Sequence, residues 1–123
     1  MMGRFSYAGS PGDTYRIDDR VLAHLELAIA AKLRLGDSFA FTLDGDDVPA
    51  GGGYRVLWMH PSIGLQFRYD SDRSAIAVNP GWVALLISQA STEAGLRIMP
   101  EPDGPILPNR RVDGPAEPRP IYG

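Results

Sequence analysis

Apolar and polar residues alternate in several short stretches of this chain, and a period of two is typical of half-buried β-strands. In segment 4–8, Phe5 and Tyr7 alternate with polar residues, and segment 14–17 alternates in the same way. The intervening residues 9–13 are rich in glycine and contain a proline, which is the composition of a hairpin loop. The pattern therefore predicts a β-hairpin at the start of the chain.

The pattern changes to a helical period over residues 19–35. Asp18 stands at the N-cap position and Gly36 follows the last helical residue, so both ends carry the expected signals. The apolar residues of one face fall within an arc of about 140° and predict a core-facing stripe. That stripe consists of Val21, Leu22, Leu25, Ala28, Ile29 and Leu33.

Three further strands are predicted at 39–43, 54–59 and 63–69, of which the first and third alternate, and a short last strand is expected after Gly95. Segment 54–59 is apolar on both faces except at Arg55, which predicts a central strand. A second helix begins at Pro80, since Asn79 is a good N-cap and proline is favoured at the first helical position. The order ββαβββαβ predicts an α+β fold, with a mainly antiparallel sheet and two helices on one face.

Proline marks a boundary near residue 100, because seven of the eleven prolines lie in residues 100–123. Proline lacks the amide hydrogen that helices and sheet ladders need. We therefore expect a compact domain over residues 1–99 and a Pro-rich, extended or disordered tail over residues 100–123.

Composition narrows the class of protein. The 123 residues are 44% hydrophobic, which suits a single folded domain and excludes a wholly disordered chain. We expect no transmembrane helix and no signal peptide. The chain has no cysteine, which excludes disulfides and thiol catalysis and favours a cytoplasmic location.

No group of residues has the spacing of a known catalytic or metal site. The acidic segment 44–47 lacks the further ligands of a calcium loop, and the glycines 51–53 are followed by a strand instead of a phosphate-binding lysine. His24 and His60 have no catalytic partner at a recognisable spacing, and Ser62 has no nucleophile elbow around it. We therefore predict no catalytic residue, no metal and no cofactor.

Two surfaces are candidates for binding. The second face of helix 19–35 is also apolar, and either a protein partner, a second copy of the chain or other parts of the same chain would cover it. Its residues are Ala23, Leu27, Ala30 and Ala31. Alternatively, the aromatic residues Tyr54, Trp58 and Phe67 would stack on nucleic acid, with Arg55, Arg68 and Arg73 nearby, although core packing is the more common role of such aromatics.

The net charge of −3 argues against a general phosphate-backbone binder, because the twelve basic residues are scattered among fifteen acidic ones.

A resemblance to a known family rests on five stretches of the sequence. These are residues 17–25, 31–39, 57–63, 79–86 and 95–102. The chain resembles a family of small actinobacterial proteins of unknown function, whose members are often labelled ATP-dependent DNA ligases. Eleven of the twelve basic residues are arginine, which agrees with such a source. The resemblance implies no role for Trp58 or His60.

The ligase label fails a chemical test. Ligases of that class attach AMP to the lysine of a Lys-x-Asp-Gly motif, but the only lysine, Lys32, is followed by Leu33-Arg34-Leu35. The nearest match in the tail, residues 111–114, has arginine where the nucleophile belongs, and arginine stays protonated in proteins. We therefore exclude ligase activity.

Three hypotheses follow for the function. The first is a non-catalytic interaction or assembly module that binds a protein partner or forms a homo-oligomer, with helix 19–35 and the Pro-rich tail as its contact surfaces. The second is an accessory protein associated with nucleic acid. The third is a small enzyme built on His60 and an acid such as Asp70 or Asp72, which requires those groups to converge in a cleft.

Overall fold

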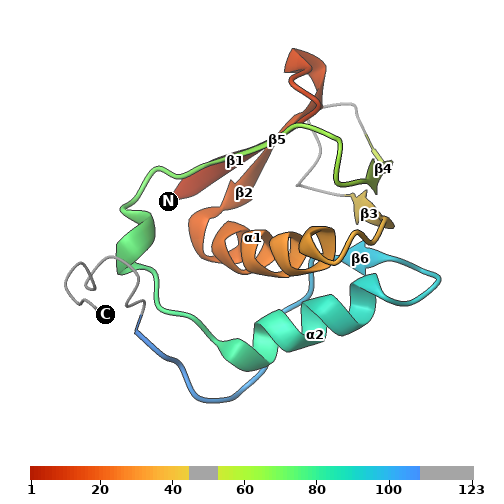
Figure 1. Cartoon of the computed structure of the whole chain (residues 1–123). Helices are drawn as coiled ribbons and strands as arrows, with labels where there is room; N and C mark the ends of the chain where they lie inside the picture. Colours follow the sequence, from red (N-terminus) through yellow and green to blue (C-terminus); the bar gives the residue numbers. More distant parts are fainter. Residues whose placement is uncertain (45–52, 109–123) are drawn as a thin grey trace, which may run out of the picture.

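The computed structural model describes residues 1–44 and 53–108, and it has the α+β class that the sequence predicts (Figure 1). The element order is ββαβββαβ, with short 3-10 turns at Pro11–Asp13 and Arg73–Ala75. The elements are β1 (Met2–Tyr7), β2 (Thr14–Asp18), α1 (Asp19–Arg34), β3 (Phe39–Leu43), β4 (Arg55–Met59), β5 (Leu65–Arg68), α2 (Pro80–Ala90) and β6 (Leu96–Arg97).

The strands form two three-stranded sheets instead of the single sheet that we expected. Sheet A has the order β2-β1-β5 and is antiparallel throughout. Sheet B has the order β4-β3-β6, in which β3 pairs antiparallel with β4 and parallel with β6. β1 is the central strand of sheet A and β3 is the central strand of sheet B.

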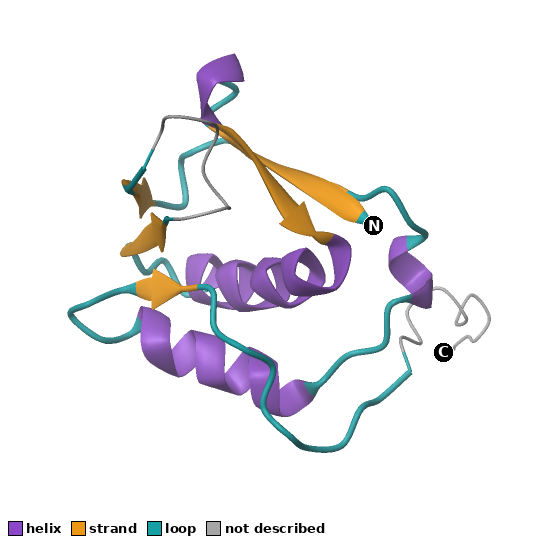
Figure 2. Cartoon of the chain, turned by 180° about the vertical axis from the view of Figure 1, so that it is seen from behind, coloured by secondary structure: helices purple, strands orange, loops and turns teal. Residues whose placement is uncertain are grey.

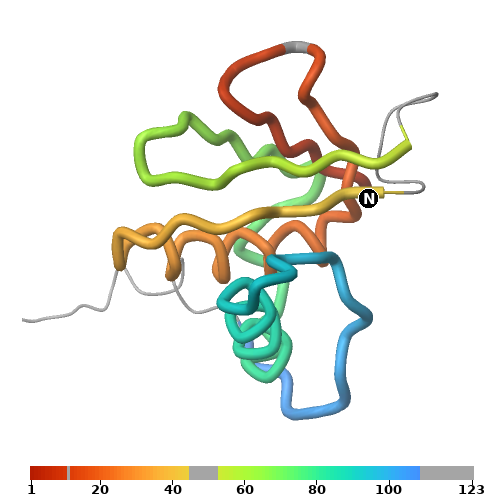
Figure 3. Tube along the Cα trace, turned by 90° about the vertical axis from the view of Figure 1, so that its right-hand side faces the viewer, coloured from red at the N-terminus to blue at the C-terminus, as the bar shows by residue number. Residues whose placement is uncertain are grey.

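The prediction of a central position for segment 54–59 is wrong. β4 pairs with β3 alone among the described strands and lies at an edge of sheet B. Figure 3 shows β3 and β4 running side by side. An edge strand with apolar residues on both faces leaves one of those faces without a covering layer.

Both helices begin where the sequence predicts, because the cap residues act as expected. The Asp18 carboxylate accepts a hydrogen bond from the Arg20 amide at 3.0 Å, and Asn79 Oδ1 accepts one from the Trp82 amide at 3.2 Å. Helix α1 packs against β1 and β2, while α2 packs against α1 and β6 (Figure 2). No helix among the described residues is long and apolar enough to span a membrane.

The core joins the two sheets through the ring of Phe5. This ring lies 5.3 Å from Phe67 and 6.3 Å from Tyr15 within sheet A, and it reaches Phe41 of sheet B at 5.7 Å. The apolar stripe of α1 closes the core, where Leu22, among others, is fully buried. Aromatic rings at such distances add to the free energy of burial.

The part of the predicted tail that the structure describes, residues 100–108, is bonded to the domain. Glu101 forms an ion pair with Arg20 at 2.8 Å, and Leu107 pairs with Val78 through two backbone hydrogen bonds of 2.7 Å. The domain boundary at residue 100 stays a prediction, and residues 109–123 lie outside the described residues.

Candidate interaction surface

One side of sheet B carries a row of exposed apolar side chains. Tyr54, Val56 and Trp58 alternate along β4 and the residue before it, so they share one side of the sheet. Their exposed fractions are 61%, 50% and 65%. We call this side, completed by Ala40 and Thr42 of β3 and Arg97 of β6, the outer face.

The strand register explains why the row is open. Trp58 lies opposite Ala40, so a small side chain faces the largest ring across the ladder, and Val56 lies opposite Thr42, which is of similar size. Thr42 itself is buried and Ala40 is partly exposed. The large aromatic side chains of β3, Phe39 and Phe41, point to the other side of the sheet, into the core. The outer face therefore keeps its largest rings at the surface.

Neighbouring groups hold the aromatic side chains and their strand in place. The Tyr7 hydroxyl, from sheet A, donates a hydrogen bond to the main-chain carbonyl of Trp58. The guanidinium of Arg97 lies 5.9 Å from the centre of the Tyr54 ring, donates to the Tyr54 hydroxyl at 3.3 Å, and lies 3.6 Å from an Asp44 oxygen. These contacts hold the Tyr54 side chain and the main chain at Trp58, which lowers the entropic cost of ordering them on binding.

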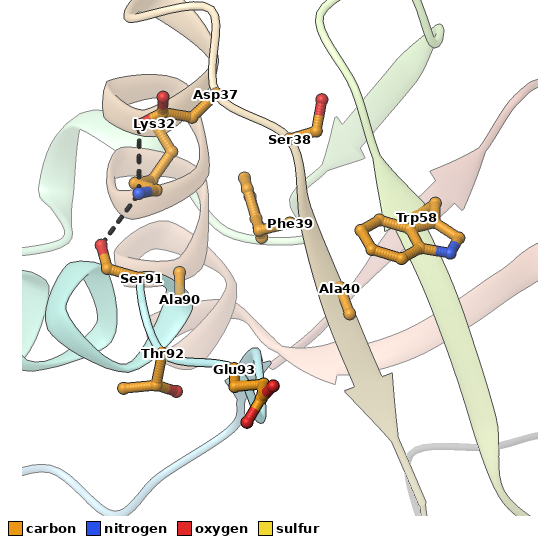
Figure 4. A pocket seen from close by; sticks show the side chains of 10 residues that line it. All are labelled: Lys32, Asp37, Ser38, Phe39, Ala40, Trp58, Ala90, Ser91, Thr92 and Glu93. Atoms are coloured by element: carbon orange, nitrogen blue, oxygen red, sulfur yellow. Dashed lines mark hydrogen bonds and ion pairs between the residues drawn. The ribbon is translucent and has the colours of Figure 1, made fainter.

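A groove of about 440 Å³ lies beside Trp58, where the start of β3 meets the C-terminal ends of both helices (Figure 4). Lys32 forms its inner wall: the ammonium donates to Ser91 Oγ at 2.8 Å and pairs with an Asp37 oxygen at 3.1 Å. Asp37 and Glu93 bring two carboxylates to the rim. The groove therefore combines an aromatic wall with hydroxyl and carboxylate acceptors.

The four predicted interaction residues of α1 differ in how exposed they are to solvent. Ala23 is fully buried, so it cannot contact a partner on the surface, whereas Leu27, Ala30 and Ala31 are partly exposed. Part of this helix is covered by α2, through the stacked rings of His24 and Trp82 at 4.4 Å and the Lys32–Ser91 bond. Binding at the three accessible positions stays a prediction.

The three arginines predicted to bind nucleic acid do not gather around the exposed aromatics. Arg55 points to sheet A, where it contacts Asp13 and the Tyr15 hydroxyl. Arg73 bonds to Glu26 at 3.4 Å, and Arg68 lies on β5 opposite Arg4.

Phe67, the third predicted stacking residue, packs against Phe5 in the core. The arginine that does lie on the outer face is Arg97, which sequence reasoning missed. Arg97 lies in a strand of only two residues, and this strand pairs with β3, which lies more than 50 positions earlier in the sequence. No local pattern in the sequence indicates that pairing.

His60 and the acids of the enzyme hypothesis have separate partners. His60 Nδ1 lies 2.7 Å from Ser62 Oγ and accepts from the Ser62 amide at 3.1 Å, which is a local turn. Asp70 pairs with Arg4, and Asp72 accepts from Ser74. Within residues 1–44 and 53–108, no three His, Asp or Glu side chains are grouped as a metal ion would require.

Together these features define a small α+β domain that presents an open aromatic sheet face. The chain belongs to the DUF7882 family, a domain of unknown function, whose family description matches residues 2–101. This confirms the expected membership of a family without an assigned function. No curated protein and no solved structure is significantly similar to the chain.

Proposed function

We propose that this protein is a non-catalytic interaction module that binds a protein partner through the outer face of sheet B. The observation that carries the proposal is the row of Tyr54, Val56 and Trp58, each at least half exposed on one side of the sheet. Contiguous exposed apolar surface with a polar rim marks interaction sites in folded proteins. Tryptophan, tyrosine and arginine are also the residues that contribute most to binding energy at interfaces.

Nucleic acid is the second candidate, because exposed aromatic rings on a sheet also stack on bases. The charges around the outer face favour a protein instead. Arg97 is neutralised by Asp44 at 3.6 Å, and the neighbouring groove exposes the carboxylates of Asp37 and Glu93. Such carboxylates repel a phosphate backbone, which needs clustered cations.

The resemblance to the actinobacterial family bears on the source of the protein and on the nucleic-acid alternative. It implies an actinobacterial source, and its ligase label is the basis of the nucleic-acid alternative. We also infer a cytoplasmic location from the absence of cysteine. The partly exposed residues Leu27, Ala30 and Ala31 of α1 are proposed as a second contact area.

The proposal is tested by recovering partners from the native host with four purified baits. These are the wild-type chain, Trp58→Ser, Leu27→Asp and the control Leu35→Ser, which removes an exposed apolar side chain at the end of α1. Thermal unfolding first verifies that all four are folded. We expect wild type and Leu35→Ser to recover the same protein, and Trp58→Ser to recover at least tenfold less.

The recovered protein is then purified and its affinity for the same four chains is measured. A partner retained equally by Trp58→Ser contradicts the role of the outer face, and loss confined to Leu27→Asp moves the interface to α1. Recovery of nucleic acid that depends on Trp58 and weakens with salt supports the alternative over the proposal.

A further inference from the structure

We infer that the outer face takes an extended, proline-rich peptide that carries an arginine, and that the occupant is the Pro-rich segment 115–120 of a second copy of this chain. The inference rests on the proposed function and names its partner. Its two components are the open aromatic face with its groove and the sequence Pro-Ala-Glu-Pro-Arg-Pro at 115–120.

The chemistry of the outer face fits a polyproline segment. Proline-rich peptides dock on surfaces lined by exposed aromatic rings, because their extended helix is formed in advance and loses little entropy on binding. Tyr54 and Trp58 are four residues apart along the chain, which corresponds to roughly 13 Å in an extended strand. The six residues 115–120 span about 16 Å as a polyproline helix, so one segment reaches both rings.

The spacing of the prolines in segment 115–120 also supports its binding to the aromatic face. A polyproline helix has three residues per turn, so residues three apart lie on one side of it. Pro115 and Pro118 have that spacing, and the Trp58 ring is the surface that such a pair of rings would contact. In such a helix Arg119, between Pro118 and Pro120, would project from another side.

Charge complementarity favours this occupant. Residues 109–123 contain three arginines and two acidic side chains, and the docked segment 115–120 itself contains Arg119 and Glu117, whereas the groove beside Trp58 exposes Asp37 and Glu93 against the single ammonium of Lys32. Lys32 is itself paired with Asp37 at 3.1 Å. Arg119 would therefore meet a carboxylate-rich rim, where a charge-assisted hydrogen bond to Glu93 is available.

The position of Pro108 favours a second copy over the chain's own tail. Leu107 pairs with Val78 beside the start of α2, whereas the groove is lined by residues at the end of that helix. Figures 1 and 2 show the described chain ending on the side away from sheet B. The 11 residues of α2 alone span about 16 Å, and the seven Cα–Cα steps from Pro108 to Pro115 reach at most about 25 Å. A path that also rounds the domain to the outer face would use nearly all of that reach.

The test uses the full chain, labelled with ¹⁵N, and a synthetic peptide of residues 109–123. The indole N–H signals of the two tryptophans give a built-in comparison, since Trp58 is exposed while Trp82 is buried and donates to the Met99 carbonyl at 3.1 Å. We expect the peptide to shift the Trp58 signal saturably and to leave the Trp82 signal in place. Raising the protein concentration alone is expected to shift the same signal and to increase the mean mass in sedimentation.

Matched variants make the result specific. A peptide with Pro115, Pro118 and Pro120 replaced by alanine should bind at least tenfold more weakly, and Arg119→Glu should also weaken binding. In the chain, Trp58→Ser should abolish peptide binding, whereas Leu35→Ser should not affect it.

Several outcomes overturn the inference. They are the absence of a saturable shift, equal binding of the alanine peptide, or binding that survives Trp58→Ser. A Trp58 shift that depends on the tail prolines but not on protein concentration assigns the site to the chain's own tail, which also overturns it. Loss of a host protein with Trp58→Ser, together with no peptide binding, leaves the proposed function intact and removes only this inference.

Discussion

Gly3 lies where β1, the end of β5 and α1 approach one another most closely. A Cβ atom at this position would lie 2.5 Å from the Arg68 carbonyl oxygen, 2.6 Å from an Asp19 carboxylate oxygen and 2.7 Å from a Leu22 methyl group. Two of these neighbours cannot move easily, because one is main chain and Asp19 is buried and bonded to Ser71. Glycine is therefore required for space at this position.

We predict that Gly3→Ala destabilises the protein by about 3 kcal/mol, at the upper end of the usual cost of overpacking. The measurement is the free energy of unfolding from urea titration. Gly64→Ala is the matched control, since nothing lies within 4 Å of its added Cβ. We expect the control to change stability by less than about 0.5 kcal/mol. Equal stability of the two variants would contradict the close approach.

At the scale of elements, His24 joins α1 to the start of α2. Its Nε2 accepts a hydrogen bond from the Asn79 amide at 2.9 Å, so the ring proton lies on Nδ1 and is donated to the Arg20 carbonyl at 2.7 Å. The ring also stacks on Trp82. This pairing holds only for the neutral imidazole, and burial lowers the pKa of His24 below its ordinary value of 6.5.

Stability should therefore fall in mild acid. The unfolded chain takes up a proton on His24 near pH 6.5, whereas the folded chain does so only at lower pH, so the free energy of unfolding decreases as pH drops below about 6.5. Urea unfolding at a series of pH values from 7.5 to 5.5 measures this slope. His24→Gln should be less stable at pH 7.5 and should show a smaller slope. An unchanged slope in His24→Gln would assign the effect to other groups.

At the scale of the whole molecule, residues 100–108 close one side of the domain. Arg20 holds Glu101 through two hydrogen bonds of 2.9 and 2.8 Å, and this contact lowers the pKa of Glu101 to about 2. Asn79 donates to Glu101 and to the Pro102 carbonyl, each at 2.9 Å. The segment thus ties the starts of both helices together.

A chain ending at Glu101 should therefore be less stable than a chain ending at Pro108. The shorter chain loses the Pro102 acceptor and both hydrogen bonds between Val78 and Leu107, and we expect it to be destabilised by about 2 kcal/mol. Thermal unfolding of the two truncated chains measures the difference. Equal melting temperatures would show that residues 102–108 contribute nothing to the fold. Binding experiments on the tail accordingly need variants that keep residues up to Pro108.

Much of the local structure could be predicted from sequence, because it depends on neighbouring residues. The caps Asp18 and Asn79, and the alternation of Phe5 and Tyr7, place helices and strands within a few positions of where they are found. The site could be predicted only in part. Trp58 and Tyr54 were candidates for a binding face, but Phe67 and Arg68 lie on β5 in the other sheet, and Arg73 lies in a 3-10 turn. Arg55 lies on the same strand as Trp58 but contacts Asp13 and the Tyr15 hydroxyl, so nearness in sequence did not place these side chains on one face.

The amino-acid sequence by itself determined the element order, the capped helix ends, the absence of thiol chemistry and the lack of a ligase motif, because periodicity, capping and side-chain chemistry are local properties. Only the tertiary structure decided the division into two sheets, the edge position of β4 and the exposure of its outer face. The physical reason is that β1 with β5, and β3 with β6, pair across more than 50 residues. The pairing of strands depends on how the whole core packs, so it cannot be predicted from any short stretch of the sequence.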